Sequence, residues 1–588
     1  MASDGATEAV NRGTELTETS TIRLWLRYNT FNMQPLLDEL SKIFQGEVFT
    51  DQSILDEYSH DASIYELVPS AVLAPTDSKD IQNLVSFVNQ HKDLYPSLSI
   101  TPRSAGTDMS GGAIGNSLVI DMTKHFDKIH SSSATMLHTQ PGVYMRDIDQ
   151  QLAGHNAMLG CVPASRAINT IGGMVANNSA GEQSLRYGNT DKSIREVSVV
   201  LADGKQYTFK PINRRELNLK MAQKNFEGAI YRKVFSLIDK NYDLIKNSRP
   251  RTHKNSMGYN LWTTWDRETG IFDMSQLFTG SQGTLGVITD IKIAPVPKAK
   301  HSGLLLAYLT DIKYLNEIIP LVTKHSPATF EGFDDITFNL GIKYFTTFRK
   351  QLGAKEWLKQ QTALLGSVVK FKGHLPNIVL MIGFEADNYE DLNKKLVAMN
   401  QDLKNHHIRI RTEIEGNEEL SEPFWEIRRA SLTLLRQRVK DKYASAFMDD
   451  LAIEPRFISQ FFPRIRAIIR KYNLPATIAG HIGDGNFHII PLMDITSPKE
   501  QLKLEPAMRE IIPIVLEYGG TLAGEHNDGM VRGPWLPAMF GEEMYQLFKD
   551  VKETFDPLYI FNPHKKTDAS WDFSMKHIRS SHQRNFYK

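Results

Sequence analysis

The sequence predicts an α+β protein with two principal domains. At 588 residues the chain is too long to fold around one hydrophobic core. Strand-like and helix-like segments alternate along both halves of the chain. The closely spaced prolines of Ala294–Pro297 block both helix and central strand, so they mark a boundary between the halves.

Composition excludes several classes of function. Lys+Arg and Asp+Glu both number 68, and this balance argues against a nucleic-acid partner that needs a broad basic surface. The only cysteine, Cys161, leaves no internal disulfide and no four-cysteine cluster. No apolar run approaches the roughly 20 residues that span a bilayer. We expect a cytoplasmic protein, in which the amphipathic patch Thr21–Tyr28 offers peripheral contact with the inner face of the membrane.

The first half begins with clear local signals. Ala71–Pro75 reads as a short strand, and Thr76–Asp80 supplies capping residues for the helix that follows. A second strand and a glycine-rich loop come next. The order from residue 71 to 121 indicates α/β alternation, or α+β if the strands pair antiparallel.

That glycine-rich loop, Thr101–Gly115, is the first candidate binding element. Its four glycines allow positive φ, so successive backbone N–H groups can converge on one point, and three hydroxyl side chains add donors. Such donors suit a pyrophosphate. The spacing is not that of the dinucleotide fingerprint, and an ordinary flexible turn explains a lone loop equally well. Two further stretches rich in small residues, Asn169–Gly181 and Thr279–Thr289, favour a binding site for a flat ligand.

The second half predicts another α+β domain with an antiparallel sheet. Gly303–Leu309 and Ile378–Glu385 read as strands, and Leu315–Lys324 and Tyr389–Lys404 as helices. This repeated strand–helix order, after a proline boundary, is typical of a separate domain.

The reactive side chains gather in the last third. His481 and His488 flank a Gly-Asp-Gly turn, and Glu525 and His526 lie in a second glycine turn. Two imidazoles and a carboxylate suit zinc, manganese or iron, with His526 beside them as a candidate base. Hydrogen bonding within a turn is the simpler explanation for a histidine pair.

Arginines near this cluster are candidate clamps for a substrate carboxylate. Arg428 lies in a helical stretch with Arg436 and Arg438 further along, and Arg532 follows the second glycine turn. A solvated helix face is the alternative interpretation of such a charged run.

Together these segments resemble the FAD-binding PCMH-type flavoproteins, similar to vanillyl-alcohol oxidase, that carry the FAD-linked oxidase C-terminal domain. Within this group the chain is similar to the branch of D-lactate, glycolate and D-2-hydroxyglutarate dehydrogenases. The order of the motifs is more specific than any one of them. The motifs are Pro102–Gly115, Thr170–Gly181, Arg186–Gly188, Gly280–Thr289, Gly480–His488, Gly524–Gly529, Phe555–Pro557 and Asn562–Pro563.

The resemblance implies a domain plan. Residues 33–298 are expected to form a two-part FAD-binding domain, and residues 299–566 a cap domain that holds the substrate. Residues 1–32 would be a flexible extension and residues 567–588 a tail. FAD is expected to be non-covalent, because the first loop lacks the histidine that often attaches it.

The resemblance also assigns site residues. His481, His488 and Glu525 are expected as ligands of a divalent metal (Zn, Mn or Fe), His526 as the catalytic base, and Arg428 as the carboxylate-binding residue. The expected cofactor-binding residues are Arg103, Ser104, Ala105, Gly106, Thr107, Asp108, Ser110, Gly111, Gly112, Pro163, Thr170, Gly172, Gly173, Asn177, Ser179, Gly181, Gly283, Thr284, Gly286, Ile288 and Asn562.

These assignments predict an FAD-dependent dehydrogenase that oxidises a small D-2-hydroxy acid to the 2-keto acid. Its electrons would pass to a quinone, a cytochrome or an electron-transfer flavoprotein. The alternatives are an oxygen-using FAD oxidase, a transferase of the alkyl-glycerone-phosphate-synthase kind, and a binding subunit that has kept the fold without the chemistry. A homodimer is a further expectation to test.

Two positions depart from the family pattern. Asn527 stands where the family usually has glycine, and so places a side chain where close approach is normally free. Phe447–Asp450 lacks the lysine that often precedes the corresponding strand in the 2-hydroxyglutarate enzymes. This difference disfavours a dicarboxylate substrate.

Overall fold

The computed structural model describes residues 33–580 except 162, 336–375, 409, 419, 423, 426, 427 and 429–442. The chain divides into two compact units, one ending at Ile43 and the other beginning at Phe44. Within the first, Gln34–Leu40 form helix α2, with a proline in the first turn. Among the described residues, no helix is both long and apolar enough to cross a bilayer. The expected extension, residues 1–32, lies outside the described residues.

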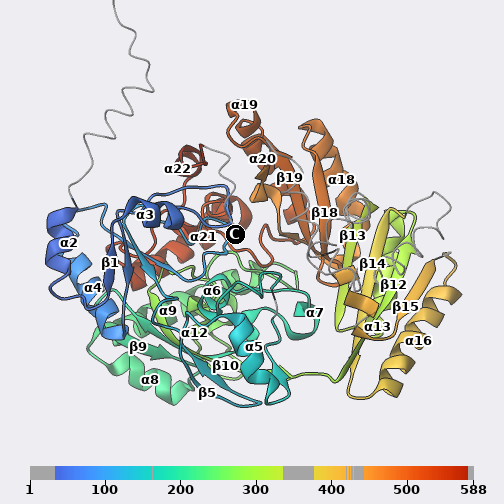
Figure 1. Ribbon diagram of the computed structural model, residues 1–588, viewed down its shortest axis with the longest axis horizontal. Helices are drawn as coiled ribbons and strands as arrows, with labels where there is room; N and C mark the ends of the chain where they lie inside the picture. Colours follow the sequence, from blue (N-terminus) through green and yellow to red (C-terminus); the bar gives the residue numbers. More distant parts are fainter. Residues whose placement is uncertain are drawn as a thin grey trace, which may run out of the picture. The chain divides into compact units, whose positions relative to one another are not determined.

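The second unit opens with a mixed four-stranded sheet in the order β1-β2-β4-β3, of which β1 is labelled in Figure 1. Strands β2, β4 and β3 are parallel, and β1 pairs antiparallel with β2. Helix α4 connects β2 to β3 and is capped by Asp77, whose carboxylate accepts from the backbone N–H groups of Lys79 and Asp80. The predicted strand–cap–helix order is therefore confirmed, and the parallel pairing decides for α/β alternation here. The elements are β1 (Glu47–Phe49), α3 (Gln52–Tyr58), β2 (Ala71–Ala74), α4 (Ser78–His91), β3 (Ile100–Arg103) and β4 (Leu118–Asp121).

A second, antiparallel sheet follows in the order β5-β6-β10-β8-β9. Its central strand, β10, begins within the third glycine-rich stretch, so residues more than 150 positions apart in the chain lie on neighbouring strands. The strands are β5 (Ile129–Ser132), β6 (Leu137–Thr139), β8 (Ile194–Val200), β9 (Gln206–Phe209) and β10 (Val287–Ile293), with the small pair β7 (Ala157–Met158) and β11 (Val296–Pro297).

Helices surround these two sheets. The second glycine-rich stretch becomes α6, whose N-cap Thr170 accepts from Gly173 N–H. The helices are α5 (Met145–Ala153), α6 (Ile171–Asn177), α7 (Ser184–Tyr187), α8 (Arg214–Ala222), α9 (Phe226–Lys240), α10 (Tyr242–Asn247), α11 (Leu261–Thr264) and α12 (Ser275–Phe278).

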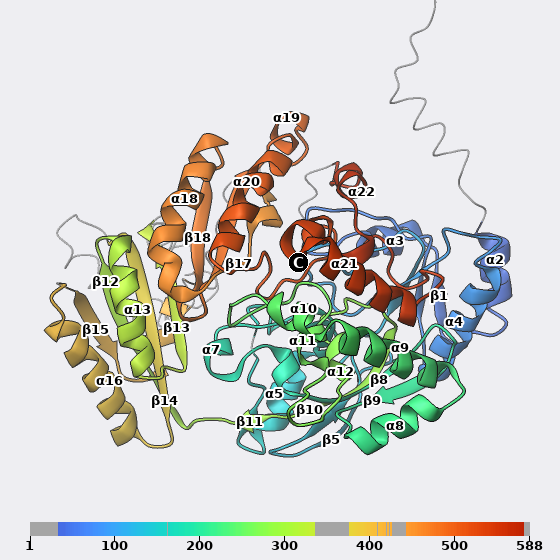
Figure 2. The same cartoon turned by 180° about the vertical axis from the view of Figure 1, so that it is seen from behind.

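The expected antiparallel sheet of the second half is confirmed as an eight-stranded sheet. Its order is β15-β12-β14-β13-β18-β19-β16, with β17 also paired to β19. Helices α13, α16, α18 and α20 cover one face (Figure 2). The strands are β12 (His301–Leu309), β13 (Thr329–Asp334), β14 (Ile378–Ala386), β15 (Arg411–Glu415), β16 (Tyr443–Ala444), β17 (Leu451–Ala452), β18 (Ala476–His481) and β19 (Asn486–Met493). The helices are α13 (Leu315–Lys324), α16 (Tyr389–Asn405), α18 (Ile458–Lys471), α19 (Pro498–Gln501) and α20 (Leu504–Glu517).

The C-terminal part of the chain returns to the first sheet. Helix α21 (Leu536–Phe555), kinked at Gly541, precedes a segment that pairs with β3, and α22 (Trp571–Lys576) follows. Ile100 N–H donates to Ile560 carbonyl at 2.7 Å, and Asn562 N–H donates to Ile100 carbonyl at 2.8 Å. This pairing fixes the C-terminal segment beside the first glycine-rich loop.

Candidate functional site

One cavity brings together the glycine-rich stretches of the first half and the β18–β19 hairpin of the second. Most of the expected cofactor-binding residues line it. These are Arg103, Ser104, Ala105, Gly106, Thr107, Asp108, Gly112, Pro163, Thr170, Gly172, Gly173, Asn177, Ser179, Gly283, Gly286 and Ile288.

The other five expected contacts, Ser110, Gly111, Gly181, Thr284 and Asn562, are not among the lining residues. Asn562 instead donates from its side chain to the carbonyls of Gly112 (2.8 Å) and Gln282 (2.7 Å). Ser110 accepts from the Gln282 side chain at 2.9 Å. Asn562 and Ser110 therefore hold the first and third loops together, and direct contact of the five with a cofactor stays a prediction.

The lining fits a flat, hydrogen-bonding cofactor. The nearest described atom to a Cβ built on Gly173 is Thr170 Oγ1 at 3.5 Å, so a side chain at this position would project into the space. Two buried oxygens that belong to lining residues, Asp108 Oδ1 and Asn169 Oδ1, have no hydrogen-bond partner within the described part of the chain. Buried acceptors normally find a donor, and the hydroxyl and ring N–H groups of FAD are donors of the required kind.

The expected metal ligands meet at the other end of the cavity. Glu525 Oε1 lies 3.4 Å from His481 Nε2 and 3.0 Å from His488 Nε2. The hairpin places the two imidazoles, since His481 ends β18 and His488 lies in β19 after the turn closed by Gly485 at φ 68°. Asp450 positions the carboxylate by accepting from Glu525 N–H at 2.9 Å.

Carboxylates behind the imidazoles set their orientation. His481 Nδ1 lies 2.7 Å from Glu331 Oε1, and His488 Nδ1 lies 3.1 Å from Asp449 Oδ1. When both Nδ1 atoms donate to these carboxylates, both Nε2 lone pairs face Glu525. Carboxylate–histidine pairs of this kind support metal ligands in proteins. The donor set of His481, His488 and Glu525 therefore fits a divalent metal ion.

The electrostatics of the cluster favour a cation. Burial alone would lower the pKa of His488, but Asp449 and Glu525 outweigh it and raise that pKa to about 10. Burial opposes ionisation of Glu331, but Arg428 and His481 hold its pKa at about 2. Glu525 likewise has a pKa well below its ordinary value despite burial, because Lys254 and His481 stabilise its charge. The cluster is thus a dense set of ionised carboxylates.

His526 stands beside the ligands. Its Nδ1 lies 3.0 Å from Asp449 Oδ2, and its Nε2 lies 3.8 Å from Glu525 Oε1. Burial lowers its pKa, but Asp450 and Asp449 outweigh burial and the net shift is upward. A histidine held by a carboxylate at one nitrogen presents the other for proton transfer.

The two arginine candidates have different environments. Arg428 lines the cavity, with Nη2 2.7 Å from Glu331 Oε2 and 3.3 Å from His481 Nε2. Arg532 is fully buried, does not line the cavity, and donates to the carbonyls of Asn527 and Asp449 at 3.0 and 2.9 Å. Arg532 therefore braces the loop behind the site. Arg436 and Arg438 lie outside the described residues.

Sequence reasoning missed three charged residues that organise the cluster: Glu331, Asp449 and Lys254. Lys254 Nζ lies 3.4 Å from Glu525 Oε2 and its side chain is fully buried. A charged residue inside a buried strand, such as Glu331 in β13, is a signal of a functional or paired group, because charged side chains are rarely buried without a partner. Its partner, however, lies 150 residues away.

Comparison with protein-family models assigns the class of protein. Residues 69–210 match the FAD binding domain, and residues 299–566 match the C-terminal domain of FAD linked oxidases. The chain therefore combines an FAD-binding domain with the C-terminal domain of the FAD-linked oxidases, and the resemblance drawn from the motifs is confirmed.

Individual relatives narrow the comparison. The chain is 24% identical over 530 residues to D-2-hydroxyglutarate dehydrogenase of Pseudomonas putida, covering 89% of this chain and 50% of that protein. It is 27% identical over 518 residues to the glycolate oxidase subunit GlcD of Bacillus subtilis, covering 86% and 91%. The chain thus spans about half the length of the first of these relatives.

The solved structures agree in fold. The structure of 4-ethylphenol oxidase from Gulosibacter chungangensis, with isoeugenol, matches with a TM-score of 0.63 at 14% identity, covering 92% of this chain and 98% of that one. At this identity the match bears on fold alone, and it agrees with the expected PCMH-type architecture.

Proposed function

We propose that this chain is an FAD-dependent dehydrogenase that oxidises a small D-2-hydroxy acid to the corresponding 2-keto acid. The observation that carries the proposal is a single cavity lined by both the glycine-rich stretches and the imidazole–carboxylate cluster. Oxidation of an alcohol carbon removes a proton and a hydride, so the base and the hydride acceptor must share one space. The names of the two relatives, D-2-hydroxyglutarate dehydrogenase and glycolate oxidase subunit, both concern 2-hydroxy acids and support the same substrate class.

Two separate groups of residues would bind the two cofactors. The loop residues Arg103–Gly112 and the α6 region would hold FAD, and His481, His488 and Glu525 would hold a divalent ion. When bound, these groups supply hydride acceptance and polarisation of the substrate hydroxyl. Everything else in the reaction falls to side chains of this chain.

His526 is the proposed base. With Asp449 Oδ2 lying 3.0 Å from Nδ1 as an ion-pair partner, the lone pair on Nε2 takes the hydroxyl proton of the substrate. The two carboxylates that raise the pKa of His526, Asp450 and Asp449, also stabilise the imidazolium that forms. Asp449 is fully buried, so water does not screen this ion pair.

Arg428 is the proposed partner of the substrate carboxylate. Its guanidinium carries several N–H donors in a planar fork, and Glu331 contacts one edge at 2.7 Å. That contact fixes the guanidinium at the cavity wall beside His481. A carboxylate bound there would bring the hydroxyl carbon close to the metal ligands.

The wall beyond the cluster suits a short substrate. Thr477, Ala479 and Ile490 line it, from alternate positions of β18 and β19. Among the described lining residues, Arg103 and Arg428 are the only lysine or arginine side chains. Since Arg103 belongs to the loop expected for the pyrophosphate, one arginine remains for the substrate, which favours a monocarboxylate.

Anaerobic titration of the purified flavoprotein with a panel of D- and L-2-hydroxy acids tests the proposal. Bleaching of the flavin by D-lactate or another short D-acid is expected. His526→Ala should retain the flavin, but the rate of flavin bleaching should fall by at least about 100-fold. His155→Ala, a surface histidine outside the cavity, is the matched control.

Two outcomes would contradict the proposal. If no 2-hydroxy acid bleached the flavin of the wild-type protein, the substrate class would be wrong. If His526→Ala reacted as fast as His155→Ala, the base would be wrong. Repeating the titration with a quinone, cytochrome c, an electron-transfer flavoprotein or air as acceptor separates a dehydrogenase from an oxidase, because an oxidase forms peroxide with air alone.

A further inference from the structure

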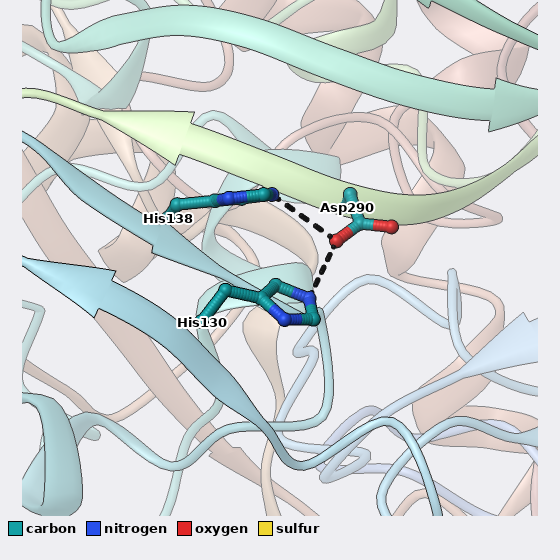
Figure 3. A group of neighbouring side chains, drawn as sticks. All are labelled: His130, His138 and Asp290. Carbon is teal, nitrogen blue, oxygen red and sulfur yellow. Dashed lines mark hydrogen bonds and ion pairs between the residues drawn. The ribbon is translucent and has the colours of Figure 1, made fainter.

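A second group of metal-binding side chains lies on the five-stranded sheet, away from the cavity described above. Figure 3 shows His130, His138 and Asp290 on three neighbouring strands, with both imidazoles directed at the carboxylate. The Nε2 atoms of His130 and His138 lie 2.9 and 3.4 Å from the same oxygen, Asp290 Oδ1. None of the three lines the flavin cavity.

Irregularities in the strands bring these side chains to one face. The β5–β6 register shifts between Ile129 and Ser131, so that His130 is an extra residue in β5, next to Ser131, the partner of His138. A second shift, between Ile288 and Asp290, lies next to the carboxylate in β10. β-bulges re-aim side chains and often lie beside functional sites. The group therefore depends on two local departures from regular pairing.

We propose that His130, His138 and Asp290 form a second metal site, which binds Zn²⁺ or a similar transition-metal ion with water as the fourth ligand. A tetrahedral zinc site with bonds of about 2.0–2.1 Å has ligand atoms about 3.3 Å apart. The observed separations of 2.9 and 3.4 Å from Asp290 Oδ1 bracket this value. All three ligand atoms lie within 4.8 Å of one another.

The chemistry of the group selects the ion. Two imidazoles and one carboxylate suit zinc, whereas magnesium and calcium prefer oxygen ligands throughout. The nearby Lys292 is paired with Glu196 at 2.7 Å, so its charge is partly neutralised.

The proposed metal site is accessible from solvent, and an ion bound there would affect the sheet. The side chains of His130, His138 and Asp290 are 36%, 31% and 26% exposed, so an ion and a water ligand can reach them. An ion bound here would join strands β5, β6 and β10 of one sheet. It would thereby stabilise the sheet that carries the third glycine-rich stretch, without contact with the substrate cavity.

Zinc stoichiometry and affinity test the inference directly. Chelator-treated, full-length protein is dialysed against Zn²⁺, and bound zinc per chain is measured, alongside calorimetric titration. Asp290→Asn and His130→Gln should each remove one zinc equivalent, or weaken that site beyond the roughly 10–100-fold typical of an outer-shell change. Asp239→Asn is the matched control, because Asp239 is a half-exposed aspartate in helix α9 that pairs with Arg267 at 2.8 Å; it should bind zinc as the wild type does.

A background variant separates this site from the proposed active-site metal. In Glu525→Gln, one zinc equivalent should persist and should disappear when Asp290→Asn is added. Zinc should raise the melting temperature of the wild-type protein more than that of Asp290→Asn, whose flavin content and turnover stay unchanged. If Asp290→Asn and His130→Gln, both folded by circular dichroism, bind zinc with wild-type stoichiometry and affinity, the inference is overturned.

Discussion

The two carboxylate oxygens of Asp449 contact two different imidazoles: Oδ2 lies 3.0 Å from His526 Nδ1, and Oδ1 lies 3.1 Å from His488 Nδ1. One fully buried carboxylate thus orients both the proposed base and a proposed metal ligand. The two imidazoles stack with ring centroids 5.1 Å apart, so a rotation of either ring would disturb the other. In the proposed reaction, this arrangement would couple proton transfer to metal binding through a residue that itself need not touch the substrate.

Asp449→Asn tests that coupling. An amide can donate to Nδ1 and so favour the wrong tautomer of His526, with the proton on Nε2. We expect turnover to fall at least about 100-fold and metal affinity to fall about 10–100-fold, with flavin still bound. Turnover, bound metal and flavin absorbance measure the three quantities separately.

Glu454→Gln is the control for this variant, since Glu454 pairs with surface arginines and does not line the cavity. Its turnover should match that of the wild type. A variant Asp449→Asn with normal turnover and normal metal content would show that the carboxylate does not set the tautomer.

Local signals in the sequence predicted most of the elements. The helix expected over Leu315–Lys324 has those bounds, and the cap expected before Ile81 is Asp77. Both depend on interactions within a few residues, which the sequence displays directly. The pairing of β2, β4 and β3 was left open, because an intervening helix fixes neither the partner nor the direction of a strand.

The residues of the candidate site also fall into those that local sequence signals predicted and those that only the folded chain reveals. The glycine turns of the sequence indicated four site residues: His481, His488, Glu525 and His526. The structure brings the ligand atoms of the first three together. Lys254 gave no such signal, because it lies in a mixed, basic segment. Its partner Glu525 is 271 residues away, and only the folded chain brings the two together.

Lys254→Met should be strongly destabilising. Lys254 Nζ lies 3.4 Å from Glu525 Oε2 and 3.5 Å from Asp484 Oδ2, and its side chain is fully buried. Removing one member of a buried ion pair leaves an uncompensated charge, which costs about 3–5 kcal/mol. Urea denaturation of the purified protein should show a loss of that size in the free energy of unfolding.

Lys192→Met provides the comparison, because Lys192 also pairs with an aspartate but is half exposed. Its cost should stay below about 1 kcal/mol. Adding Glu525→Gln to Lys254→Met should recover part of the loss, since neither charge then remains alone. Strict additivity of the two changes would contradict the ion-pair explanation.

The affinity for FAD should depend on pH through Asp108. Burial, together with Asp61, raises the pKa of Asp108 from its ordinary 3.8 to about 6. The folded protein therefore holds this proton to higher pH than the unfolded chain does. The group favours the folded state at low pH, and its contribution falls as pH rises towards 6.

A pyrophosphate placed beside this loop would add negative charge and oppose ionisation of Asp108. FAD affinity should then decrease as pH rises above about 6, by at most about tenfold per pH unit for one proton. Asp108→Asn should remove this dependence. Fluorescence titration of the apoprotein with FAD at several pH values measures how the affinity changes with pH in the wild type and in Asp108→Asn. If the affinity changed equally with pH in both proteins, Asp108 would not be the source of the dependence.

The structure explains how the chain accommodates Asn527 at a position where the family resemblance leads us to expect glycine. Its φ of 61° is a left-handed conformation that glycine adopts freely and asparagine adopts more readily than most residues. The side chain is fully buried but does not line the cavity. It donates to the carbonyls of Asn177 (3.0 Å) and Gly280 (2.9 Å), and accepts from Lys566 Nζ at 2.8 Å.

Asn527→Gly should therefore keep the backbone conformation and lose the bridge between three segments. With about 1 kcal/mol for each hydrogen bond lost, the free energy of unfolding should fall by about 2–4 kcal/mol. Asn527→Ala should cost roughly 1–2 kcal/mol more, because alanine is strained at positive φ. Denaturation of both variants measures the difference. A glycine variant as stable as the wild type would mean that the bridge contributes nothing and that the position only requires the left-handed backbone.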